Sequence, residues 1–145
     1  MRDLANLLGA LQHADSFFPS GSVSFSWGLE TLHSDRIVMS AGELAGFVEG
    51  QLRHRWATCD ACALTAAFRA GGELDRVAAV DHIVEAMTLV TELREGSKRA
   101  GASLLNVHAK LGTPGAGEYR ERVRKRVAHG HLPVVQGTLW RAVGM

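Results

Sequence analysis

The chain of 145 residues has few of the residues that mark several large classes of protein. Two cysteines are too few for a disulfide framework, and three prolines leave room for long uninterrupted helices. No apolar run approaches the roughly 18 residues of a membrane span, and polar residues interrupt the N-terminus where a secretory leader would be apolar. These absences predict a reduced, cytoplasmic protein with no membrane segment.

Net charge is also small. The chain carries 16 basic and 15 acidic residues, for a net charge of +1, which argues against a basic nucleic-acid binder and against a disordered chain. Five basic residues nevertheless fall within Arg120–Arg126. Charge runs on helices usually face water, so we expect a solvated helix face there, with contact to an acidic partner or a phosphate as the alternative.

What the sequence does have is helical periodicity. Apolar residues spaced by three and four predict helices over 3–14, 40–56, 58–70 and 73–111, the last with a break near Gly96 or Gly101. Ser40 and Glu43 form a capping box, and Thr113-Pro114 and Pro133 are typical of helix starts. The alternating run 22–27 fits a strand or a helix, and we favour a helix because no second strand is evident. The prediction is a single all-α, multi-helix, bundle-like domain over residues 1–145.

The motifs of common catalytic sites are absent from the sequence. None of the three lysines follows a glycine, so there is no P-loop, and neither His-Glu-x-x-His nor Gly-x-Ser-x-Gly occurs. We therefore expect a protein that is not an enzyme.

Two pairs of residues that lie close together in the sequence could bind a metal. Cys59 and Cys62, at i and i+3 on a helix, could form half a metal site or a redox pair, although small packing residues in an Ala-rich helix are the simpler interpretation. His129 and His131 could supply imidazole ligands, or could simply suit a helix terminus. The alternative function is therefore a small redox or metal-binding helical protein that uses these four side chains.

Four segments of the chain resemble the family of the urease accessory protein UreF. Residues 15–30 resemble its signature D-S-x-x-P-x-G-x-x-S-x-S-x-G-L-E, and Asp60 resembles its aspartate in the helix after the capping-box helix. Residues 92–101 resemble E-L-R-x-x-S-x-x-x-G, and residues 131–137 resemble H-x-P-V-x-x-G. The matching residues are Asp15, Ser16, Pro19, Gly21, Ser24, Ser26, Gly28, Leu29, Glu30, Asp60, Glu92, Arg94, Ser97, Gly101, His131 and Pro133.

This resemblance implies an all-α homodimer that acts as a non-catalytic scaffold in urease maturation. Family members join the accessory protein UreD (also called UreH) and the GTPase UreG on the urease apoprotein, and enable nickel insertion into its active site. The resemblance implies that the assembled complex handles nickel, that this chain binds no cofactor, and that the C-terminal helices of the family are missing here. In the signature loop, Phe17 and Phe18 are expected to fold back onto the core, with contact to a partner as the alternative.

Overall fold

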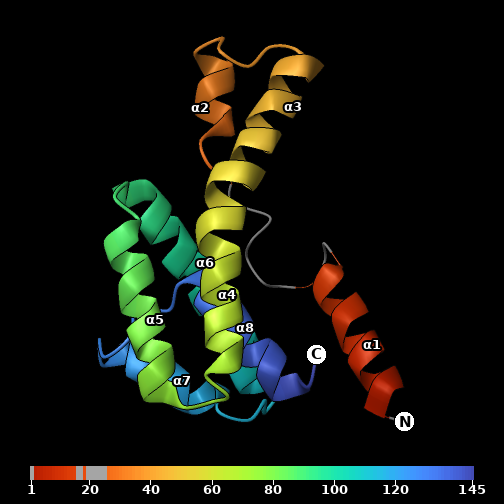
Figure 1. Cartoon of the computed structure of the whole chain (residues 1–145), viewed down its shortest axis with the longest axis vertical. Helices are drawn as coiled ribbons and strands as arrows, with labels where there is room; N and C mark the ends of the chain where they lie inside the picture. Colours follow the sequence, from red (N-terminus) through yellow and green to blue (C-terminus); the bar gives the residue numbers. More distant parts are fainter. Residues whose placement is uncertain (1, 16–17, 19–25) are drawn as a thin grey trace.

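The computed structural model describes residues 2–15, 18 and 26–145, which form helices joined by short connections (Figure 1). In chain order these are α1 (Arg2–Ala14), α2 (Leu29–Ser34), α3 (Ala41–Gly50), the π-helical segment η2 (Gln51–Asp60), α4 (Ala61–Arg69), α5 (Leu74–Met87), α6 (Thr91–Lys110), α7 (Ala116–Arg124) and α8 (Leu132–Val143). The described residues include no strand, which confirms the predicted all-α class. No helix among them combines the length and apolar character needed to cross a membrane. Ser16, Phe17, Pro19, Gly21, Ser24 and most of the ambiguous run 22–27 lie outside the described residues.

The core lies between α4, α5, α6, α7 and α8, in the lower part of the molecule in Figure 1. Its buried apolar side chains are Ala63, Ala67, Ala70, Val77, Ala78, Val84, Leu104, Leu105, Ala116, Tyr119, Ala128, Val134, Val135 and Leu139. Helices α4 and α8 pack closely because small residues meet there. A Cβ atom on Gly137 would stand 2.1 Å from the Leu64 carbonyl oxygen. Full burial of each Val or Leu side chain contributes about 1.5–3 kcal/mol to folding.

One helical rod runs through α3, η2 and α4, from Ala41 to Arg69 (Figure 1). The prediction of two helices divided near residue 57 was therefore wrong, since the backbone passes this point in a π-helical register without a break. The predicted capping box is confirmed. Ser40 Oγ accepts from the Glu43 amide, and the Glu43 carboxylate accepts from the Ser40 amide. Helix α2 lies beside the upper part of the rod, and neither α2 nor α3 contains a buried residue.

The break in the second long apolar stretch falls at residues 88–90, rather than near Gly96 or Gly101 as predicted. Thr88 follows the end of α5, and its hydroxyl donates to the Val84 carbonyl at 2.8 Å, a local bond that competes with helix continuation. Gly101 lies inside α6 for a packing reason. A Cβ atom there would stand 2.0 Å from the Gly130 carbonyl oxygen.

The last two helices differ in how well their starts follow the sequence signals. Helix α7 begins at Ala116 after Gly115, which has a left-handed φ of 75°, so the start predicted at Thr113-Pro114 was wrong. Helix α8 has Pro133 in its first turn, as predicted. The basic cluster on and after α7 is largely exposed, as expected for a solvated face, and Arg124 and Lys125 pair with Glu121.

Helix α1 is joined to the core by an imidazole pair. The Nε2 atoms of His13 and His108 are 2.9 Å apart, and His108 Nδ1 lies 2.9 Å from Thr113 Oγ1. Phe18 packs beside them and against the core, as expected for this residue. The predicted amphipathic helix forms, but its apolar stripe (Leu4, Leu7, Leu8 and Leu11) remains 56–61% exposed.

Replacing Gly101 by alanine should lower the free energy of unfolding by about 2–3 kcal/mol, because the new methyl group would overlap the Gly130 carbonyl. Urea denaturation measures this change. Gly46→Ala in α3 is the matched control. A Cβ there meets nothing within 4 Å, so the same substitution should be neutral or stabilising. Equal effects at the two positions would contradict the packing role of Gly101.

The folding stability should depend on pH through His108. Burial lowers the pKa of this imidazole from 6.5 to about 4, and the neighbouring His13 adds to the effect. Protonation therefore disfavours the folded state, so the contribution of His108 is complete above pH 6.5 and is lost as the pH falls toward 4. When the pH is lowered from 7 to 5, the free energy of unfolding should fall for the parent. For His108→Gln the fall should be smaller by about 2 kcal/mol. Thermal melts across pH measure this, and the exposed control His54→Gln should follow the parent.

Candidate functional site

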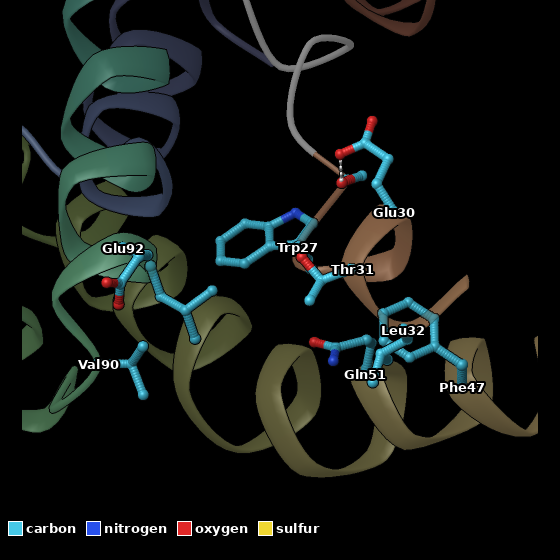
Figure 2. A pocket seen from close by; sticks show the side chains of 11 residues that line it. Trp27, Glu30, Thr31, Leu32, Phe47, Gln51, Val90 and Glu92 are labelled. Carbon is cyan, nitrogen blue, oxygen red and sulfur yellow. Dashed lines mark hydrogen bonds between the residues drawn. The ribbon is translucent and has the colours of Figure 1, made fainter. Parts of the chain in front are cut away.

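Two adjacent pockets form a groove between α2, the rod and the start of α6. The upper pocket has a volume of about 660 Å³ and the lower one about 280 Å³, and Trp27 and Gln51 line both. Figure 2 shows the upper pocket, with the Trp27 ring between α2 and the residues that begin α6. We call the two pockets together the signature groove, because residues of all four family-like segments line them. Those residues are Ser26, Gly28, Glu30 and Glu92 in the upper pocket, and Asp60, Ser97 and Pro133 in the lower one.

The first signature segment turns into α2 at the upper pocket. Gly28 has a φ of 89°, in the left-handed region that favours glycine. Ser26 Oγ donates to the Glu30 carboxylate at 2.5 Å (Figure 2). The Ser26 carbonyl accepts from the Leu29 amide at 3.1 Å. These bonds close the turn before α2 and set Trp27 against the groove.

Arg55 links Trp27 to Asp60 in the lower pocket. Its guanidinium lies 5.1 Å from the Trp27 ring centroid, and its Nε donates to both Asp60 carboxylate oxygens at 3.2 Å. The Arg55 and Asp60 side chains are 18% and 16% exposed. Arg55 Nη2 is buried and has no hydrogen-bond partner within the described part of the chain. Arg55 therefore holds Trp27 and Asp60 together at the wall of the lower pocket.

Other family-like residues support the turn that leads into α8. Ser97 Oγ accepts from the Leu132 amide at 3.2 Å, and Gly101 lets the Gly130 carbonyl approach α6. Arg94 points elsewhere and donates to the Thr88 carbonyl at 3.2 Å, which holds the α5–α6 connection. Glu92, Arg94, Ser97 and Gly101 belong to one family-like segment of the sequence. In the structure Glu92 and Ser97 line the groove, whereas Arg94 and Gly101 support the connections around it.

Asp81, which the sequence reasoning missed, holds the same turn from the opposite side. Its fully buried carboxylate accepts amide hydrogens from His129, Gly130 and His131 at 2.8, 2.6 and 3.0 Å. It also accepts from the Tyr119 hydroxyl at 3.2 Å. Burial first, and the adjacent carboxylate second, raise the pKa of Tyr119 well above its ordinary value. An aspartate within the apolar stripe of α5 was the sequence signal available for this contact.

His131 is buried against Glu85, and its ring centroid lies 6.1 Å from that of His129. His131 Nε2 lies 2.8 Å from the Glu85 carboxylate, and Lys98 approaches the same carboxylate at 3.4 Å. Burial lowers the pKa of His131, and the hydrogen bond to Glu85 only partly offsets this. Partial burial raises the pKa of Glu85, but the bond from His131 and the charge of Lys98 bring it below its ordinary value.

The two cysteines lie away from this cluster, in a cavity of about 230 Å³ between the rod and α5. Its lining is largely apolar and includes Val80, Ile83 and Met87. Burial, and then the charge of Asp60, raise the pKa of Cys59, which favours the thiol over the thiolate that binds metals. Across the described ranges, no group of three or more His, Cys, Asp or Glu side chains is arranged to hold a metal ion. Cys59, Cys62, His129 and His131 are therefore not brought together as one ligand set.

The described residues thus define an all-α protein whose family-like residues gather around an open groove. The pattern of the UreF family matches residues 38–145, and the chain belongs to this family. No solved structure gives a significant match.

Curated relatives agree with this assignment, and each carries the name urease accessory protein UreF. The Haemophilus influenzae protein is 32% identical over 142 residues, which cover 95% of this chain and 60% of the relative. The Kocuria rhizophila protein is 36% identical over 147 residues, 97% of this chain and 60% of the relative. The Actinobacillus pleuropneumoniae protein is 32% identical over 142 residues, which cover 95% of this chain and 63% of the relative. The chain thus spans about 60% of the length of these relatives.

Asp81→Asn should lower the free energy of unfolding by about 3 kcal/mol. The carboxylate now accepts hydrogen bonds from buried backbone amides, and the NH₂ group of asparagine cannot accept them. Chemical denaturation measures this loss. The control is Asp75→Asn on the same helix, where the side chain is 92% exposed and the stability should barely change. A similar small effect at both positions would contradict the role given to Asp81.

Proposed function

We propose that this chain is a urease accessory protein, a non-catalytic scaffold that assembles with UreD/UreH and the GTPase UreG on the urease apoprotein. In this proposal it works in the cytoplasm as a homodimer and enables nickel insertion into the urease active site. The assembled complex handles the nickel, and no cofactor resides in this chain. Membership in the UreF family, and the names of relatives that the chain covers in part, support the proposal.

The observation that carries the proposal is the convergence of the four family-like segments on the signature groove. Residues as far apart as Ser26, Asp60 and Pro133 line the two pockets. Such a groove, whose lining includes aromatic and aliphatic side chains together with Arg55, fits a segment of a partner protein. Leu52 and Trp56 of the rod, which line the lower pocket, are exposed apolar side chains that add to this contact surface.

The alternative of a small redox or metal-binding protein that uses Cys59 and Cys62 with His129 and His131 has less support. The cysteines line an apolar cavity, whereas His131 is bound to Glu85. Family membership favours the scaffold function instead.

Val90→Asp should weaken partner binding by about thirtyfold, because it places a charge on the apolar wall of the upper pocket. Val90 is 51% exposed, so the fold should tolerate the change. The measurement is co-purification of the tagged chain with UreD/UreH and UreG after co-expression. Val127→Asp is the matched control, since Val127 is 48% exposed and lies outside the groove. Failure of the parent chain to retain either partner would contradict the proposal, and equal loss in both variants would contradict the role of the groove.

A further inference from the structure

His82 and His129 form a pair of facing imidazoles outside the signature groove. His82 Nδ1 and His129 Nε2 are 2.9 Å apart, and the two rings meet edge to face with centroids 4.8 Å apart. His82 is exposed on α5, and the His129 side chain is 30% exposed. The pair therefore lies at the surface, and it joins residues 47 positions apart in the sequence.

The backbone that carries the two rings is firmly held. His82 follows Asp81 on α5, and the Asp81 carboxylate accepts the backbone amide of His129 at 2.8 Å. The adjoining amides of Gly130 and His131 bind the same carboxylate. The separation of the imidazoles thus follows from a buried backbone contact rather than from two free surface side chains.

The Glu85 carboxylate lies near the other nitrogen of the His129 ring, beyond hydrogen-bond distance. It lies 3.6 Å from His129 Nδ1, and it is itself held by His131 at 2.8 Å, Lys98 at 3.4 Å and Arg94 at 3.7 Å. The negative charge of this carboxylate nevertheless favours the tautomer with its proton on Nδ1, which leaves the Nε2 lone pair directed at His82.

We propose that His82 Nδ1 and His129 Nε2 form half of a binding site for a first-row divalent transition cation such as Zn²⁺ or Ni²⁺, with Glu85 as a nearby negative charge. Metal–imidazole bonds are about 2.0–2.1 Å, so two such ligands at adjacent coordination positions stand about 3 Å apart. In the free protein one imidazole donates to the other. On binding, the proton between them moves to the solvent-facing nitrogen of His82, and both facing lone pairs reach the cation. Water or a partner's side chain fills the remaining positions.

This assignment replaces His131 with His82 as the partner of His129, and it makes no use of the cysteines. Imidazole nitrogens select transition cations over Mg²⁺ and Ca²⁺, which prefer oxygen ligands. A site with two protein ligands exchanges its cation readily, and so differs from a resident cofactor site. It is a property of this chain alone and does not depend on the scaffold function proposed above.

Calorimetric titration of the purified chain with Zn²⁺, Ni²⁺ and Mg²⁺ tests the site. The parent should bind Zn²⁺ and Ni²⁺ but not Mg²⁺, and His82→Ala and His129→Ala should each weaken that binding at least tenfold. Glu85→Gln should weaken it less than the loss of either histidine does, because Glu85 acts on His129 through its charge and not through a hydrogen bond. His129→Ala retains the backbone amide that Asp81 binds, so circular dichroism should find it folded. In the NMR spectrum, paramagnetic Ni²⁺ should broaden the imidazole signals of His82 and His129 first.

Two controls separate this site from other donors. His54→Ala removes an exposed histidine on the rod, and Cys59→Ser removes a thiol, and both should bind as the parent does. The proposal is overturned if the parent binds neither cation. It is equally overturned if His82→Ala binds as tightly as the parent, or if Cys59→Ser alone abolishes binding.

Discussion

The contact between the buried Asp81 carboxylate and the turn at residues 129–131 is the constraint on which much of the molecule depends. A carboxylate buried in an apolar core is unfavourable unless its oxygens are occupied, and three backbone amides and the Tyr119 hydroxyl occupy them here. The turn is thereby fixed between α5 and α6 immediately before α8 begins. The position of α8, the burial of His131 against Glu85, and the facing imidazoles of His82 and His129 all follow from this contact.

The signature groove depends on the same arrangement through its lower wall. Leu132 and Pro133, which begin α8, line the lower pocket opposite Arg55 and Asp60 of the rod. Trp27 then connects the rod to the start of α2, because the Arg55 guanidinium lies over its ring. Family-like residues therefore divide into two kinds. Some, such as Glu30 and Asp60, line the groove, whereas Gly101 allows the close approach that keeps its wall in place.

Helix existence could be predicted from this sequence more reliably than helix boundaries. Apolar spacing and the Ser40 capping box are local signals, and both correspond to helices in the structure. The break at residues 88–90 was missed because the prediction took glycine as the marker of a helix end. Gly101 instead lies inside a helix, where the lack of a side chain lets the Gly130 backbone pack closely against it. The rod was divided wrongly near residue 57, because a π-helical register leaves no sequence signal as clear as a cap or a proline. The apolar stripe of α1 likewise predicted the helix but not that it would stay exposed.

The sequence by itself determined the all-α class, most of the helices and the family-like segments, because each of these is encoded by residues close together in the chain. The tertiary structure alone decided which segments meet. It brought Ser26, Asp60 and Pro133 around one groove, gave His129 the partner His82 in place of His131, and made Asp81 a buried anchor. Such pairings are set by how helices pack over long separations in sequence, where the spacing of residues along the chain carries no information about distance in space.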